Sequence, residues 1–243
     1  MALREVAGAL LRKSELDWVS GAGCKMVQLQ FGQSKELLRV LCLGAHSDDI
    51  EIGCGGTILR LLAQSRDVEV NWIVFSSGRE RKAEALNSAS QFLAKATRRE
   101  VTIKNFPGSF FPYKGQAIKA FFERVKRQVS PDIIFTHYRH DLHQDHRVLS
   151  DFTWNTWRNH LILEYEIPKY DGDLGVPNMF VPLDEATVRT KSRILMDSFR
   201  TQRTKQWFSE DTFLSLARIR GVECNSPDRY AEAFYSRKAT IQL

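Results

Sequence analysis

The stretch LRVLCLGAHSDDIEIGCGGT, residues 38–57, joins an apolar run to a polar turn and a glycine-rich segment. Leu38 to Leu43 is apolar and rich in β-formers, which predicts a buried strand. A histidine and two aspartates follow shortly after that strand. Burying these side chains together costs free energy unless a bound group pairs with them. We interpret the glycines as a tight turn into the first helix, because GCGGT does not match a phosphate-binding loop.

The chain continues as an alternation of strand and helix patterns. Strand patterns at 68–75, 100–106 and 131–136 alternate with helical patterns at 56–64, 80–96 and 115–129. Such alternation predicts right-handed crossovers and a parallel sheet. We therefore predict an α/β fold, a Rossmann-like three-layer sandwich with a mostly parallel central sheet, in one domain over residues 1–243. Its core spans about 38–157, and residues 158–243 complete the fold and the substrate mouth.

A second polar cluster follows the fourth predicted strand. The commonest strand order in such sheets begins 3-2-1-4, and ligands bind at the carboxyl ends of strands 1 and 4. The fourth strand runs into THYRHDLHQDHR, residues 136–147, which holds four of the six histidines: His137, His140, His143 and His146. We therefore expect both clusters to meet at one edge of the sheet.

Three residues of these clusters form a candidate metal site. His46 and Asp49 are three positions apart, so both can reach one ion, and His146 could supply a third ligand from the neighbouring strand end. Two histidines and one carboxylate, with a position left for water, suit a catalytic zinc. Non-haem iron uses the same ligand set and remains the alternative metal.

The neighbouring residues have the chemistry that hydrolysis needs. Asp48 is free to take a proton from water, and His143 is placed to stabilise an oxyanion or protonate a leaving amine. Asp145 could orient a histidine. Taken singly, Ser47 or Asp48 could instead cap a helix, and His137 and His160 are more often structural than ligating.

Composition excludes several other classes of protein. The chain has 35 basic and 29 acidic residues, a net charge of +6, but no basic tail and no stacking motif, so we expect no nucleic-acid partner. The sequence contains no run of 18 apolar residues, so we expect no transmembrane helix. The N-terminal MALREVAGALLRKSELDW is expected to be an amphipathic helix. The four cysteines lack CxxC spacing, which favours reduced thiols in a cytoplasmic protein: Cys24, Cys42, Cys54 and Cys224.

Two motifs carry a resemblance to a known family. Residues 45–49, AHSDD, resemble the AHPDD motif of the PIG-L, or LmbE-like, de-N-acetylases, and residues 143–146, HQDH, resemble that family's HxDH motif. The resemblance covers about Leu38 to Trp157. It implies a zinc-dependent hydrolase that removes acetyl from N-acetylglucosamine units or similar amino sugars. It implies the zinc ligands His46, Asp49 and His146, the general base Asp48, and His143 as oxyanion stabiliser or acid.

The resemblance also bears on substrate contacts. Arg81 and Glu84 match residues that open the family's second helix, and Arg81 is by analogy a sugar-hydroxyl contact; an ion pair with Glu84 is the structural alternative. Ser47 replaces the family's usual proline. The loop NFPGSFFPY, residues 105–113, lacks the acidic residue that relatives often place there. Its aromatic residues line a pocket or belong to the core: Phe110, Phe111 and Tyr113.

The substrate remains open at this stage. The positive charge favours an amino sugar linked to a phosphate or nucleotide, and the turn-rich segment 165–180 is expected to border the mouth of the site. A non-catalytic nucleotide- or sugar-binding protein is the alternative function. The acyl group, the native metal and any association of identical chains into a homo-oligomer are not determined by the sequence.

Overall fold

The computed structural model describes residues 37–64 and 67–240, and the predicted N-terminal amphipathic helix lies outside them. Strands and helices alternate over most of the described chain. Their order is β1 (Leu37–Gly44), α2 (Asp49–Ala63), β2 (Asp67–Val74), α3 (Arg79–Phe92), β3 (Arg98–Ile103), η1 (Phe111–Lys114), α4 (Gly115–Gln128), β4 (Ile133–His137), α5 (Gln144–Thr156), β5 (Leu161–Tyr165), β6 (Met179–Leu183), α6 (Glu185–Ser198), η2 (Arg200–Gln202), α7 (Glu210–Glu223) and β7 (Tyr230–Ser236).

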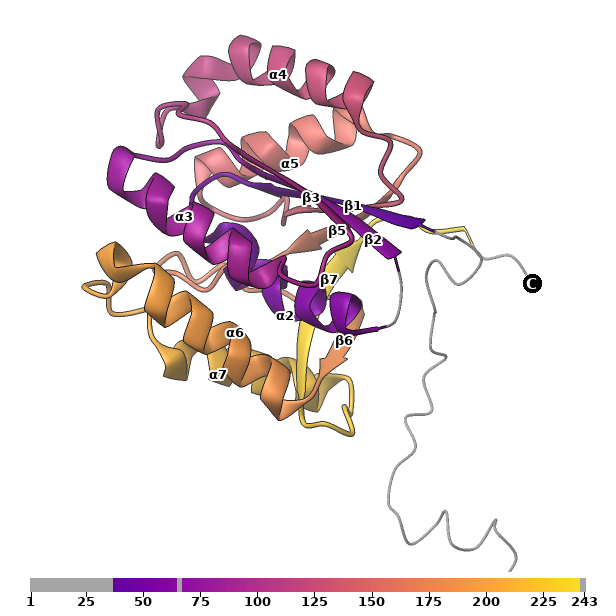
Figure 1. Ribbon diagram of the computed structural model, residues 1–243, viewed down its shortest axis with the longest axis vertical. Coiled ribbons are helices and arrows are strands. Elements are labelled where there is room, and N and C mark those ends of the chain that lie inside the picture. The colour runs from indigo at the N-terminus through magenta and orange to yellow at the C-terminus, as the bar shows by residue number, and fades with distance from the viewer. Residues whose placement is uncertain (1–36, 65–66, 241–243) are drawn as a thin grey trace, which may run out of the picture.

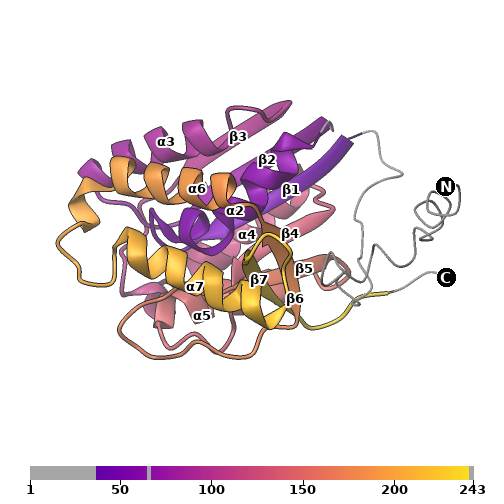
Figure 2. The ribbon, with the colours of Figure 1, turned by 90° about the horizontal axis from the view of Figure 1, so that it is seen from below.

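The strands form one mostly parallel sheet with the order β3-β2-β1-β4-β5-β7-β6. Strands β1 to β5 run parallel to their neighbours, whereas β7 runs antiparallel to β5 and β6. Helices α4 and α5 lie on one face (Figure 1), and α2, α3 and α6 lie on the other (Figure 2). The predicted α/β sandwich and the 3-2-1-4 order are both confirmed.

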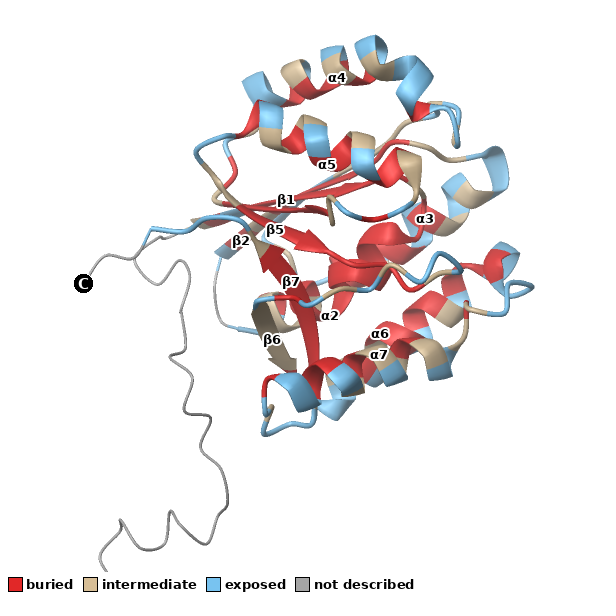
Figure 3. Ribbon diagram, turned by 180° about the vertical axis from the view of Figure 1, so that it is seen from behind, coloured by how far each residue is buried: buried red, intermediate tan, exposed pale blue. Residues whose placement is uncertain are grey.

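The sheet separates two apolar layers, because successive side chains of a strand point to opposite faces. On β1, Leu41 and Leu43 pack with α4 and α5, whereas Val40 and Cys42 pack with the helices of the other face. Figure 3 shows the central strands, such as β1 and β5, as buried between these layers. Because β1 and β4 are adjacent and parallel, the loops that follow them leave the sheet at the same edge.

The glycine-rich segment is helical, so the predicted tight turn is wrong. Helix α2 begins at Asp49 and contains Gly53, Gly55 and Gly56. A Cβ on Gly53 would lie 2.1 Å from Cδ2 of Tyr165, a fully buried ring on β5. Gly53 is therefore needed for the close approach of α2 to β5, and this approach holds the start of α2 beside the strand ends.

We expect Gly53→Ala to destabilise the fold by ~1–3 kcal/mol, because the added methyl group overlaps a ring that cannot move away. The change should lower the urea midpoint of the full chain. The matched control is Gly115→Ala at the start of α4, where the added Cβ makes only an ordinary contact at 3.6 Å with Phe152. Equal midpoints for the two variants would refute the packing role of Gly53.

No helix among the described residues is long and apolar enough to cross a membrane. Cys42 and Cys54 are buried free thiols, Cys224 is also buried, and Cys24 lies outside the described residues.

Candidate metal centre

The turn after β1 and the start of α5 bring the three predicted ligands together. His46 lies in the turn, Asp49 begins α2, and His146 lies in the first turn of α5. His46 Nδ1 is 3.2 Å from His146 Nε2 and 3.4 Å from Asp49 Oδ2, and the last two atoms are 3.6 Å apart. Ligand atoms around a tetrahedral zinc, at bonds of ~2.0–2.1 Å, lie about 3.4 Å apart, so this donor set fits zinc.

Two overlapping groups of three also have donor atoms close enough to share an ion. One is His46, His143 and His146, and the other is Asp49, His137 and His146. The second group is less suitable, because the Nε2 of buried His137 already accepts a hydrogen bond from the Ala45 N–H at 2.9 Å. This bond favours the structural interpretation of His137.

The Asp48 side chain does not cap a helix, and the Ser47 hydroxyl donates to the Ser77 hydroxyl at 3.0 Å, so the capping alternative is wrong. Asp48 occupies the N-cap position of α2, yet its side chain makes no capping bond. Its Oδ1 accepts a hydrogen bond from Arg81 Nη2 at 2.6 Å instead. Burial raises the pKa of Asp48, against the opposing charge of Arg81. A buried carboxylate with a raised pKa suits a general base.

Arg81 pairs with Asp48 and not with Glu84, so the helix-surface pair proposed as an alternative is also wrong. Glu84 accepts hydrogen bonds from the backbone N–H and the hydroxyl of Thr201. The Arg81 side chain keeps 27% of its surface exposed, whereas Asp48 keeps 4%. Arg81 thus connects the buried carboxylate to the surface of the molecule.

His143 is held in one tautomer by the start of α5. It is the N-cap of that helix, and its Nδ1 accepts the Asp145 N–H at 3.2 Å. In the neutral ring the proton is therefore on Nε2. Burial and the nearby positive charge of His46 lower the pKa of His143, which favours this neutral form. His143 is consequently a hydrogen-bond donor through Nε2.

Asp145 joins the loop 105–113 to the cluster. Its Oδ2 lies 3.1 Å from His46 Nε2, and its two oxygens accept the N–H groups of Ser109 and Phe111 at 2.6 and 3.1 Å. These contacts suit a residue that orients His46. Of the aromatic residues in this loop, Phe111 belongs to the core, whereas Phe110 and Tyr113 are 56% and 77% exposed.

Asp141 is a site residue that was not predicted from the sequence. This buried carboxylate lies with Oδ2 2.8 Å from His146 Nδ1, and its Oδ1 accepts the His143 N–H at 2.8 Å. A hydrogen bond of this kind fixes which nitrogen of a ligating histidine faces the metal. The sequence feature that could have indicated this role is its position among the histidines of RHDLHQDH, residues 139–146.

The three candidate ligands differ in protonation. Burial alone would lower the pKa of His46, but the charge of Asp49 and the hydrogen bonds to Asp145 and Asp49 raise it to about 9. Burial, helped by the charge of His137, lowers the pKa of His146 to about 3. Burial would raise the pKa of Asp49, but the three surrounding histidines hold it well below its ordinary value.

These directions predict that His46 releases about one proton when zinc binds at pH 7.5, in addition to any proton lost by a zinc-bound water. His46 must lose its proton to ligate, whereas His146 is already neutral and Asp49 already ionised. Calorimetry of zinc binding in two buffers of different ionisation enthalpy measures this number. Because the pKa of His46 is about 9, the part of the release that comes from His46 should fall to about half at pH 9. No release at pH 7.5 would contradict the protonated state of His46.

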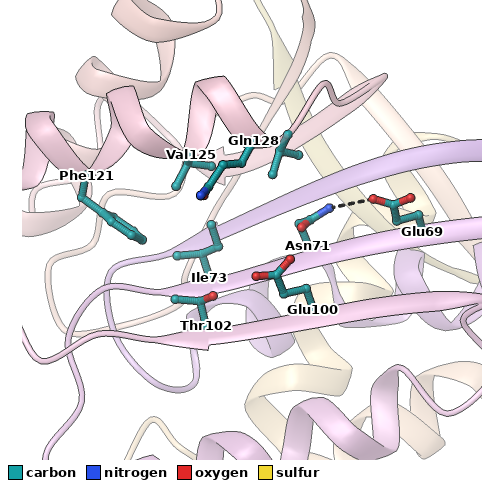
Figure 4. A pocket seen from close by; sticks show the side chains of 9 residues that line it. Glu69, Asn71, Ile73, Glu100, Thr102, Phe121, Val125 and Gln128 are labelled. Carbon is teal, nitrogen blue, oxygen red and sulfur yellow. Dashed lines mark hydrogen bonds between the residues drawn. The ribbon is translucent and has the colours of Figure 1, made fainter.

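A groove of about 340 Å³ lies elsewhere, between α4 and the strands β2 and β3 (Figure 4). Its polar walls include Glu69 and Glu100, and the Asn71 amide donates to Glu69 at 3.4 Å. None of the predicted site residues lines this groove. The predicted site therefore lies apart from this groove, at the carboxyl ends of β1 and β4.

Comparison with known proteins supports the resemblance to a family. Residues 41–157 match the model of the family described as PIG-L: GlcNAc-PI de-N-acetylase. The resemblance to the PIG-L family is therefore confirmed for this part of the chain. The matched range contains every predicted site residue, from His46 to His146, and it ends at Trp157, as the resemblance had indicated.

Solved structures share the fold of this chain. A conserved protein from Thermus thermophilus is 18% identical with a TM-score of 0.66, covering 85% of this chain and 97% of its own. N,N'-diacetylchitobiose deacetylase from Pyrococcus horikoshii is 19% identical with a TM-score of 0.61, covering 82% and 83%. GalB, the 4-carboxy-2-hydroxymuconate hydratase from Pseudomonas putida, is 15% identical with a TM-score of 0.66, covering 85% and 98%. The fold therefore supports more than one reaction, and the reaction must be argued from the site.

Proposed function

We propose that this chain is a metal-dependent hydrolase that removes an acetyl or other acyl group from the nitrogen of an amino sugar, such as an N-acetylglucosamine conjugate. The observation that carries the proposal is the set of His46, Asp49 and His146 donor atoms within 3.6 Å of one another, with the Asp48 carboxylate beside it in the sequence. The family description and the activity of the Pyrococcus horikoshii relative support the same reaction class.

His46, Asp49 and His146 would hold the metal, which we assign as zinc with iron as the alternative. When bound, such an ion polarises the amide carbonyl and makes a coordinated water more acidic. Arg81 donates a hydrogen bond to Oδ1 of Asp48. We therefore assign the other oxygen, Oδ2, as the atom that accepts a proton from the attacking water. Asp48 then carries this proton to the amine that leaves.

His143 would stabilise the charge that develops on the amide oxygen. Its Nδ1 accepts the Asp145 N–H, so its Nε2–H is the donor available to an oxyanion. Asp145 and Asp141 would orient His46 and His146. The C–N bond breaks, the acyl group leaves as a carboxylate, and the amine leaves with the proton from Asp48.

Arg81 is our candidate for contact with a sugar hydroxyl, because its side chain is partly exposed while it also contacts Asp48. The net charge of +6 favours a small-molecule substrate that carries a phosphate or nucleotide. We also propose that segment 165–180 shapes which sugar conjugate is accepted.

The test is release of primary amine from a panel of N-acetylglucosamine derivatives, including nucleotide-linked ones, by the zinc-loaded full chain. We expect release from at least one member and loss of this release on chelation. The acid product should appear in equal amount. If the chain binds zinc but releases amine from no N-acyl amino sugar, the proposed reaction is wrong.

A further inference from the structure

Lys169 lies one contact away from a candidate metal ligand. Its Nζ is 3.0 Å from Asp141 Oδ2, and the same oxygen is 2.8 Å from His146 Nδ1. Lys169 follows β5 in the sequence, whereas Asp141 and His146 follow β4. The contact therefore connects the segment 166–176 to the loop that carries the candidate ligand.

A second carboxylate holds Lys169 in this place. Lys169 Nζ also contacts Asp173, whose Oδ2 accepts the Leu142 N–H at 2.7 Å. The Lys169, Asp173 and Asp141 side chains keep 8%, 5% and 2% of their surface exposed. Burying an ammonium group costs free energy unless carboxylates such as these two pair with it. We therefore treat the lysine and its two partners as one fixed arrangement.

We propose that Lys169 is a positioning residue for the metal-binding face of His146. The step rests on the proposed function, since it assumes that His146 binds the metal through Nε2. An ammonium only donates hydrogen bonds, so Lys169 aligns Asp141 with Oδ2 toward His146 and Oδ1 toward the His143 N–H. In this way the buried Lys169 side chain positions two histidines of the site without itself contacting substrate.

Zinc affinity of the full chain, measured by competition with a chromophoric chelator, tests this proposal. Lys169→Met should weaken zinc binding about 10-fold, the size seen when a partner of a ligating histidine is lost. Removing a positive charge near the site would by itself tighten cation binding, so a weaker affinity reports lost positioning. Lys169→Arg keeps the donor and should restore most of the affinity.

The matched control is Lys191→Met. Lys191 is also buried and paired, with Glu232 at 2.6 Å and the Ile52 carbonyl, and it contacts none of the candidate ligands or their carboxylate partners. We expect this variant to lose thermal stability but keep the zinc affinity of the parent. If Lys169→Met also loses thermal stability but keeps the zinc affinity of the parent, Lys169 has only a structural role and the proposal is wrong.

Kinetics and a second variant separate the remaining outcomes. Lys169→Met should lower kcat and leave KM within about twofold, because Lys169 does not touch substrate. If Lys169→Met fails to fold, Asp173→Asn keeps the lysine but removes one of its two carboxylate partners. This variant should also weaken zinc binding, and unchanged affinity would overturn the proposal.

Zinc binding without amine release by the parent chain refutes only the proposed reaction. Equal zinc affinity in the parent and Lys169→Met refutes only the role of Lys169.

Discussion

Asp48→Asn should lower turnover by ~10²–10⁴-fold while the chain keeps its zinc. Asparagine has nearly the same shape, and its Oδ1 can still accept the Arg81 Nη2–H that contacts Asp48 at 2.6 Å. It cannot take a proton from water, so the chemical step loses its base. Metal content and steady-state amine release, measured on the same zinc-loaded sample, test both halves of this expectation.

Asp151→Asn is the matched control for this variant. Asp151 lies on α5 with its side chain exposed, and we assign it no role in the site. Its variant should retain the turnover of the parent. If Asp48→Asn keeps more than about a tenth of the parent's turnover, the assignment of the base is wrong. Loss of zinc in that variant would place Asp48 in the metal site itself.

The position of the site could be predicted because it follows from topology. The alternation of strands and helices predicts a parallel sheet, and the usual order places the first and fourth strands side by side. His46 and His146, 100 positions apart, then come to 3.2 Å between ring nitrogens. Residue type adds the remaining information, since histidine and aspartate at two converging strand ends have few uses other than metal binding.

The partners of these residues could not be predicted, because they depend on which way each side chain turns. Arg81 was predicted to contact a sugar hydroxyl or to pair with Glu84, and its hydrogen bond to Asp48 was not predicted. Asp141 stands among the histidines, but only the path of the loop turns it toward His146. Lys169 comes from a segment with no regular pattern, so nothing in its local sequence indicates its contact.

The glycines show a different reason for error. A sequence shows that glycine is free to adopt unusual backbone angles, and from this we inferred a turn. Here Gly53 is helical, and its use is the absence of a side chain against Tyr165. Tyr165 is 112 positions away in the sequence, so the reason for the glycine is tertiary. The same misreading placed the start of α2 at Gly56 and not at Asp49.

Asp49→Ala should abolish both zinc binding and turnover, in contrast to the change at the adjacent carboxylate. Asp49 Oδ2 lies within 3.6 Å of a ring nitrogen of His46, His137 and His146, and it also accepts the His46 N–H at 2.6 Å. No other carboxylate belongs to the two candidate metal groups found among the described residues. Its removal should weaken zinc binding by more than the ~10–100-fold that follows loss of an outer partner.

The contrast between neighbouring aspartates decides between two metal sites. If Asp49 is a ligand, Asp49→Ala loses zinc while Asp48→Asn keeps it, although both changes remove one negative charge from the same turn. If the metal is held by His46, His143 and His146 alone, Asp49→Ala retains one zinc per chain with little change in affinity. In that case His143 is a ligand and cannot be the oxyanion donor, so the measured zinc content of this single variant would reassign two residues of the proposed mechanism.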